Sequence, residues 1–503
     1  MNRLKRFMLN GILTALVAVA MRFAGLLLNI FITRKLGAAG MGLLSLINSV
    51  FGFALTFSTA GVNLAATRLC AQALARNSVR ELKKALRYCI GYALLFGVLA
   101  LLCLWTFADF IASKLLSAPD ASLCLRLLAV CMPIFSLTAA LGGYFTAVRR
   151  AWKNAVSAVL EQAVKIVVVI LLFSHVSPKS SAGACLLVIF SMVCAEVVSG
   201  AVTLLLYLLD IVTQRGEGKG EEGVLRRLFA VAFPVALSSY IRSALVTIEH
   251  ILIPRGLGKA GNPEGALATY GVVQGMAFPV IFFPTALLYA FTGLVIPEMT
   301  YAKEKREKNQ IGRMTEKVLH LTLLFAIGCG GALFVFADCL GMAFYKNAEA
   351  GYYIRMMAPL IPVMYLDSAT DALLKGMGEQ VYTMKVNVAD ALFSLVMVTL
   401  LVPKMGIAGY ILVVYVSEAV NLGFSLYRLY RMTDVLPRLL RSVSLPVLGV
   451  ILFLPLGHPA LVGFLALRMI LGVFIYLLFL ILSGCIGKDE KELWHKTIAK
   501  SSE

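Results

Sequence analysis

Long apolar runs alternate with short polar loops along the whole chain of 503 residues. Fourteen runs can be distinguished, and they fall roughly at 8–33, 41–65, 86–108, 121–148, 155–174, 184–210, 228–252, 269–296, 318–337, 353–374, 386–403, 406–427, 442–457 and 460–483. Most of them are long enough to cross a hydrocarbon core of about 30 Å as an α-helix. Lipid offers the backbone no hydrogen-bond partners, so a helix satisfies its own groups there. The pattern predicts an all-α polytopic membrane protein with fourteen transmembrane helices.

Positive charge is distributed unevenly among the loops. The N-terminus, the even-numbered loops and the C-terminus hold 32 of the 46 Lys and Arg residues, whereas the odd-numbered loops hold 8. Short loops rich in Lys and Arg stay in the cytoplasm, so both termini are predicted to be cytoplasmic. The net charge of +19 lies mainly in these loops, where the anionic leaflet attracts it. We therefore expect membrane lipids as partners and no nucleic acid.

The chain shows no motif of an enzyme or a metalloprotein. Its ten cysteines form no C-x-x-C pair, its five histidines form no H-E-x-x-H pattern, and no P-loop occurs. We expect no catalytic residues, no bound metal and no cofactor. Transport driven by ATP hydrolysis within this chain is not indicated.

The sequence contains an internal repeat. Residues 29–37 (NIFITRKLG) and 250–258 (HILIPRGLG) match at five of nine positions. Pro133 and Glu161 are 28 residues apart, as are Pro362 and Asp390. Because six spans per half is an even number, both halves have the same orientation, and the repeat is parallel with its pseudo-two-fold axis along the membrane normal.

This repeat predicts four parts of the chain. They are an N-terminal lobe (1–212, spans one to six), a Gly-rich cytoplasmic linker (213–227), a C-terminal lobe (228–430, spans seven to twelve), and two extra helices with a cytoplasmic tail (431–503). Two lobes joined by a flexible tether favour alternating access around a central cavity.

Arginines inside or beside the leading spans predict a binding site for an anion. Arg22 lies mid-span without an acid in its own helix, and Asn29 is its nearest polar neighbour on the same face. Arg242 occupies the seventh span. We expect Arg22 and Arg242, one from each lobe, to bind an anionic headgroup, since the guanidinium fork matches phosphate oxygens. The repeat-related Arg34 and Arg255 are expected near an outer gate, with snorkelling to the outer headgroups as the alternative.

Other ionisable residues within the spans are candidates for a cavity or for ion coupling. They are Glu249, Glu161, Lys165, Asp367, Asp371 and Asp390. Structural alternatives stand beside each: Glu161 and Lys165 can neutralise each other, the stripe of Asp367, Asp371 and Lys375 can hold helices together, and Glu249 can hold Arg242 in place. Coupling to the membrane potential, Na⁺ or H⁺ is the corresponding functional hypothesis.

Several segments resemble the bacterial lipid-linked oligosaccharide flippases. These are residues 21–37 (MRFAGLLLNIFITRKLG), 63–68 (NLAATR), 143–146 (GYFT), 160–165 (LEQAVK) and 375–378 (KGMG). They are similar in particular to the stage V sporulation protein B branch of the multidrug/oligosaccharidyl-lipid/polysaccharide exporter superfamily. The resemblance covers the whole chain and implies fourteen helices in two lobes plus two extra helices.

The resemblance also implies a function at the bacterial plasma membrane. It implies flipping of undecaprenyl-pyrophosphate-linked oligosaccharides or peptidoglycan-type precursors to the outer leaflet, in contact with cell-wall synthesis enzymes. Arg22 and Arg34 match cavity arginines of the peptidoglycan lipid flippases, whereas Leu28 and Asn29 replace a further arginine and an acid of their first helix. The alternatives are a cation-coupled multidrug antiporter and a non-transporting scaffold for envelope or spore-cortex assembly.

Overall fold

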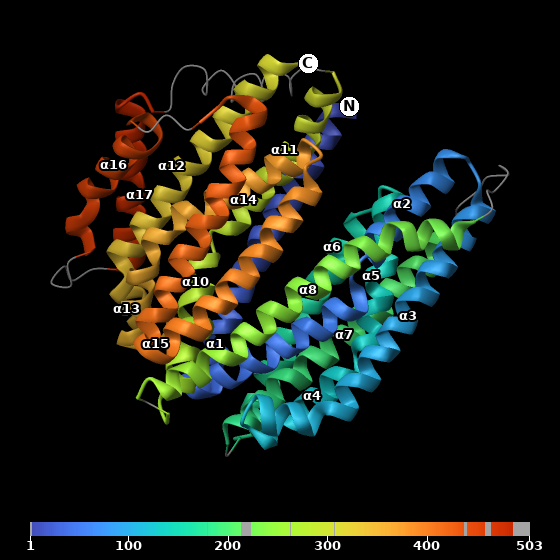
Figure 1. The fold of residues 1–503 in the computed structure, drawn as a ribbon, viewed down its shortest axis with the longest axis horizontal. Coiled ribbons are helices and arrows are strands. Elements are labelled where there is room, and N and C mark those ends of the chain that lie inside the picture. Colours follow the sequence, from blue (N-terminus) through green and yellow to red (C-terminus); the bar gives the residue numbers. More distant parts are fainter. Residues whose placement is uncertain are drawn as a thin grey trace. The chain divides into compact units, whose positions relative to one another are not determined.

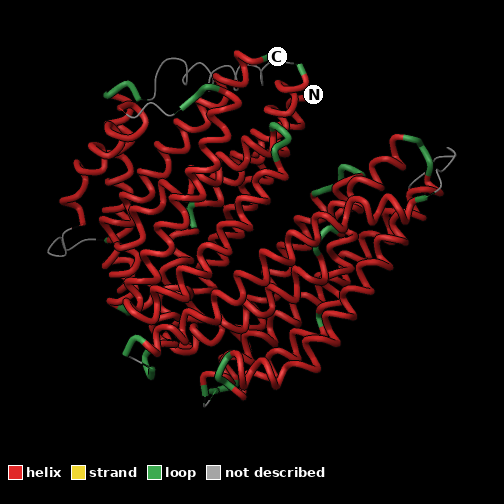
Figure 2. The backbone as a smooth tube through the Cα atoms, viewed as in Figure 1, coloured by secondary structure: helices red, strands yellow, loops and turns green. Residues whose placement is uncertain are grey.

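The structure is a computed structural model that describes residues 3–178, 180–212, 223–261, 263–305, 307–436, 440–457 and 464–485. These residues form helices joined by short turns, and no strand occurs among them (Figure 2). Ten helices in this part of the chain are long and apolar enough to cross a membrane. An eleventh crossing results if the bent pair Ala266–Phe282 and Thr285–Glu304 is taken as one span.

Two of the ten helices hold two predicted runs each. α1 (Arg3–Thr59) has 57 residues and α15 (Gln380–Thr433) has 54, which is about twice what one crossing needs. Each contains a glycine with a non-helical backbone, Gly37 at φ 69° and Gly406 at φ 62°. The tenth predicted run lies in three consecutive short helices over residues 348–376. The prediction of fourteen spans is therefore consistent with the structure.

The chain divides into two compact units. The second unit comprises described residues within 31–271 and 394–407. Besides parts of α1 and α15 it contains α2 (Val62–Ala75), α3 (Val79–Phe110), η1 (Ile111–Leu115), η2 (Pro119–Ala121), α4 (Ser122–Val130), α5 (Met132–Ala147), α6 (Trp152–His175), α7 (Ser181–Ile211), α8 (Val224–Lys259) and α9 (Ala266–Gly271).

The first unit comprises described residues within 1–30, 272–393 and 408–503. Besides the rest of α1 and α15 it contains η3 (Val272–Ala277), α10 (Phe278–Phe282), α11 (Thr285–Glu304), α12 (Lys308–Leu340), η4 (Gly341–Tyr345), α13 (Ala348–Met357), η5 (Ala358–Leu360), α14 (Ile361–Gly376), η6 (Leu440–Ser444), α16 (Leu445–Phe453), η7 (Leu454–Gly457) and α17 (Leu465–Leu482). Both α16 and α17 pack beside α12 (Figure 1). The two units are defined by contacts between residues, whereas the predicted lobes 1–212 and 228–430 are defined by the sequence repeat. The lobe boundaries therefore stay a prediction.

The internal repeat is visible in local geometry within each unit. In the second unit α3 ends in the π-helix η1, and Arg126 forms a 2.6 Å ion pair with Asp109. In the first unit α12 ends in the π-helix η4, and Arg355 forms a 2.6 Å ion pair with Asp338. Both pairs span 17 residues, and both members shift by the offset of 229 that separates Glu161 from Asp390.

Backbone conformations repeat at the same offset. Ser117 (φ 55°) corresponds to Lys346 (φ 52°), and Arg149 (φ 58°) corresponds to Gly378 (φ 80°). Left-handed residues are uncommon outside glycine, so their recurrence at matching positions is specific. The parallel repeat predicted from the sequence is thus present in the fold.

Each unit has a core of buried apolar side chains at its helix contacts. In the second unit Leu69 of α2 and Leu228 of α8 belong to one cluster with residues of α3 and α5. In the first unit Met299 of α11, Leu319 of α12 and Leu373 of α14 belong to another. Burying a side chain of this size contributes about 1.5–3 kcal/mol relative to its exposure in water.

Replacing Gly37 by alanine should lower the free energy of unfolding by about 1–3 kcal/mol, because its left-handed backbone strains any residue with a Cβ. A Cβ at Gly37 would meet no atom within 4 Å, so the effect comes from the backbone alone. Gly52 also has open space and lies in regular helix, so Gly52→Ala is the matched control and should not destabilise. Unfolding in detergent measures both, and equal stability of the two variants would contradict the prediction.

Candidate functional site

Arg22 lies in the first unit beside the point where the helical path is interrupted between α10 and α11. Its Nη2 donates to the carbonyl of Phe282 at 3.3 Å and to Thr285 Oγ1 at 3.4 Å. The two helices that meet there differ in direction by 50°. Pro284 stands at the break and supplies no N–H, which is a common cause of a bend. The guanidinium therefore contacts neutral acceptors, and it forms no ion pair with the described residues.

Asn29 lies two helical turns after Arg22 on α1 and also contacts the first unit. Its Oδ1 accepts a 3.1 Å hydrogen bond from the hydroxyl of Tyr345, the last residue of η4. The Asn29 amide is thus bonded to Tyr345, a residue that the sequence analysis did not select. Only the packing of α1 on residues more than 300 positions away reveals this partner.

The three other predicted arginines belong to the second unit. Arg242 of α8 is exposed and makes no hydrogen bond or ion pair with any described residue. Arg255, near the end of α8, donates to the backbone carbonyls of Lys114 and Leu115. Its side chain thereby caps the C-terminal end of η1. Arg34 of α1 is exposed. The predicted roles of these arginines in binding or gating stay predictions.

The acid predicted to accompany Arg242 has another partner. Glu249 Oε1 accepts a 2.7 Å hydrogen bond from Ser394 of α15, and Glu249 is half-buried. Its predicted role in ion coupling stays a prediction.

A stripe of acids crosses two helices of the first unit. Asp371 of α14 accepts from Lys375 at 3.3 Å and from Asn387 of α15 at 3.4 Å. Asp390 of α15 accepts from Ser417, which lies beyond the break at Gly406 in the same helix. Asp367 Oδ1 is buried and has no hydrogen-bond partner among the described residues. Asp371 and Lys375, two members of the predicted stripe, are thus in contact. The hydrogen bonds from the Asn387 amide and the Ser417 hydroxyl were not predicted.

The corresponding part of the second unit contains Glu161, Lys165 and Glu196. Glu161 and Lys165 of α6 influence each other electrostatically, but the described residues include no salt bridge between them. Glu196 of α7 is buried and accepts a 3.3 Å hydrogen bond from Thr138 of α5. No group of three or more His, Cys, Asp or Glu side chains in the described part of the chain could hold a metal ion.

Two further charge clusters in the second unit serve the packing of helices. Asp210 of α7 is 1% exposed and accepts from Tyr144 at 2.8 Å and from Arg150 and Lys153. Glu81 of α3 is likewise buried and bonds Arg76 and, at 2.8 Å, Arg227 of α8.

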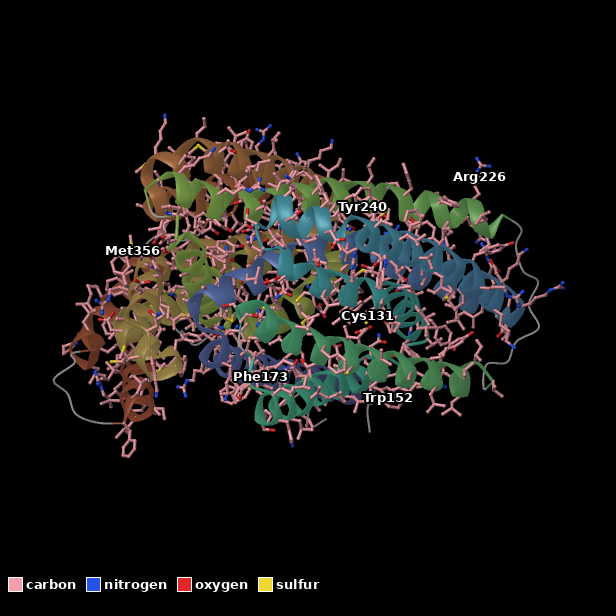
Figure 3. The ribbon with its side chains drawn as sticks, turned by 90° about the horizontal axis from the view of Figure 1, so that it is seen from below. Cys131, Trp152, Phe173, Arg226, Tyr240 and Met356 are labelled. Carbon is pink, nitrogen blue, oxygen red and sulfur yellow. The ribbon has the colours of Figure 1, made fainter. Side chains whose placement is uncertain are left out.

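The basic residue next to the Glu81 cluster is exposed. Arg226, which precedes Arg227, points away from the ribbon at the start of α8 (Figure 3). The sequence analysis did not single out either cluster.

The amino-acid sequence matches two protein-family models. The family model "Polysaccharide biosynthesis protein" matches residues 7–300, which is more than half of the chain. The chain belongs to this family. A second model, MatE, matches residues 239–400.

Proteins of one bacterium are similar to this chain over most of their length. Stage V sporulation protein B of Bacillus subtilis (strain 168) is 26% identical over 422 residues, which cover 80% of each chain. Sporulation protein YkvU of the same strain is 24% identical over 386 residues, covering 75% of this chain and 83% of the relative. The predicted resemblance to the stage V sporulation protein B branch is confirmed.

Solved structures share the fold at low identity. The Lipid II flippase MurJ in an inward closed conformation has a TM-score of 0.72 at 12% identity and covers 95% of this chain and 99% of its own. An inward-facing multidrug resistance MATE family transporter of the MOP superfamily has a TM-score of 0.67 at 14% identity, covering 84% and 98%. These structures show that the chain has the fold of a multidrug transporter and a lipid flippase, and its apolar helices make it a multi-pass membrane protein.

Replacing Asp210 by asparagine should destabilise the second unit by about 3–5 kcal/mol, because Lys153 would remain buried without its carboxylate. The exposed Asp120 offers a control, and Asp120→Asn should change stability by less than about 0.5 kcal/mol. Thermal unfolding of both variants in detergent checks this expectation. A melting temperature for Asp210→Asn equal to that of the control would show that the cluster does not stabilise the unit.

Proposed function

We propose that this transporter moves an undecaprenyl-pyrophosphate-linked oligosaccharide or peptidoglycan-type lipid precursor to the outer leaflet by alternating access. The observation that carries the proposal is Arg22, a cation in a membrane-spanning helix whose contacts in the described chain are a carbonyl and a hydroxyl. A charge at bilayer depth costs at least about 2.5–3.5 kcal/mol, so such a residue tends to serve a ligand.

The chemistry of the arginines favours an anionic headgroup. A guanidinium presents parallel N–H groups that match two phosphate oxygens, and a lipophilic cation would be repelled by it. Arg242 of the second unit, without a partner among the described residues, adds a further cation. The family name and the Lipid II flippase among the structural neighbours support a lipid-linked substrate for this chain.

The membrane potential can supply the driving force. An inside-negative potential favours outward movement of a negative headgroup by about 2.3 kcal/mol per charge per 100 mV. With both termini in the cytoplasm, as the loop charges predict, the substrate enters from the side where it is made. After release the empty site must return, and a Na⁺ or H⁺ that neutralises an acid would couple this step to an ion gradient. Glu249 is our first candidate, and Asp367, Asp371 and Asp390 are the others.

Replacing Arg22 by alanine should reduce translocation of the lipid-linked sugar about 10- to 100-fold, the loss expected for a hydrogen bond to a charged group. Lysine at this position should restore part of the activity, because it keeps the charge and loses the fork. The measurement is transfer across the bilayer of proteoliposomes that contain an undecaprenyl-pyrophosphate sugar.

Arg355→Ala is the matched control, since Arg355 also lies in a predicted span but pairs with Asp338. Parallel vesicles loaded with a cationic dye test the rival function. Dye export with no sugar-lipid transfer would establish a multidrug antiporter, and inactivity toward both substrates would favour a scaffold. Either result would overturn the proposal.

Replacing Glu249 by glutamine should remove the dependence of transport on an imposed Na⁺ or H⁺ gradient while substrate binding persists. The amide keeps the shape and can still bond Ser394, but it cannot take up a proton or balance a sodium ion. Glu264→Gln, in an exposed turn after α8, is the control. If Glu249→Gln weakens binding and leaves the gradient dependence unchanged, the residue holds the site and does not couple.

A further inference from the structure

The break between α10 and α11 leaves backbone carbonyls that need partners. In a continuous helix the carbonyl of Phe282 would accept from the N–H of Ala286, which instead bonds Phe283. Inside a membrane such a carbonyl must be satisfied by another group of the protein. Thr285 Oγ1 donates to it at 2.6 Å, and Arg22 Nη2 donates to it at 3.3 Å.

The neighbouring carbonyl has a partner of its own. The hydroxyl of Tyr365 on α14 donates to the carbonyl of Ile281 at 3.0 Å, and both Tyr365 and Thr285 are buried. The break is therefore held by side chains from two directions.

Thr285 plays two parts at this position. Its hydroxyl hydrogen points to the Phe282 carbonyl, so its oxygen lone pairs are left to accept from Arg22 at 3.4 Å. The two acceptors are bonded to each other and hold a single nitrogen of the guanidinium. Most of the five N–H donors of Arg22 have no partner among the described residues.

We propose that Thr285 is a positioning residue for Arg22 and holds one nitrogen of the guanidinium so that the remaining N–H groups bind a phosphate or pyrophosphate. This inference rests on the proposed function, because it assumes that the ligand of Arg22 is an oxyanion. A guanidinium already fixed in one rotamer loses less entropy on binding, and an ordered donor set raises affinity. Thr285 acts through Arg22 and does not itself contact the ligand.

The chain offers a matched control on the same helix. Thr292 of α11 is also buried, and its hydroxyl also donates to the carbonyl three residues earlier, that of Tyr289 at 3.3 Å. No hydrogen bond between Thr292 and an arginine occurs in the described chain. A change of Thr292 to valine thus removes a similar hydroxyl and leaves Arg22 untouched.

The test is equilibrium binding to the purified full-length protein in nanodiscs. The probes are undecaprenyl pyrophosphate and undecaprenol, which share the lipid tail and differ in the charged group. Thr285→Val and Thr285→Ala should each weaken binding of undecaprenyl pyrophosphate about five- to tenfold and leave undecaprenol unchanged. Thr285→Ser should restore wild-type binding, and Thr292→Val should match the wild type.

The outcomes separate this inference from the proposed function. If Arg22→Ala weakens undecaprenyl pyrophosphate binding while Thr285→Val and Thr285→Ala behave like Thr292→Val, the positioning role is wrong and the anion site stands. Equal losses for both lipids in the Thr285 variants would indicate a structural role and also overturn the inference. If Arg22→Ala binds undecaprenyl pyrophosphate normally, the proposed function itself fails.

Discussion

The absence of water in the hydrocarbon core constrains every feature of this chain. Backbone groups there must bond within the protein, so the described spans are helices and each interruption needs substitute partners. At the break after Phe282 those partners are side chains, Thr285 and Arg22 on one carbonyl and Tyr365 on the next. The Arg22 side chain is thereby held by the same groups that satisfy the backbone at the bend.

The same constraint divides the charged residues into two kinds. Asp210 and Glu81 are buried with basic partners within bonding distance, and such clusters are neutral or cationic units that fix helices. Arg22 instead bonds a neutral carbonyl and a neutral hydroxyl. A charge with a neutral partner retains its field, and an external ion or headgroup can therefore respond to it.

The spans and the repeat could be predicted from the sequence because hydropathy and spacing are local properties. The non-helical residues Gly37 and Gly406 interrupt α1 and α15 where one predicted run gives way to the next, so these kinks agree with the separate runs. The pairs Asp109–Arg126 and Asp338–Arg355 were missed, although their common offset of 229 was readable in the sequence. Thr285 could not be found, because its partner lies 263 residues away and many hydroxyls occur in the spans.

The two halves of the repeat match best in their ion pairs and turns, and they differ most in the surroundings of their intramembrane acids. Glu161 has the cation Lys165 one turn away in its own helix, whereas its counterpart Asp390 bonds Ser417 and neighbours Asp367. The first unit thus places three acids, Asp367, Asp371 and Asp390, in the neighbourhood of Lys375. Acids that lie close together in a low dielectric attract a mobile cation. If the two halves arose from one ancestral unit, this difference between their acids is where the proposed coupling to an ion would enter the fold.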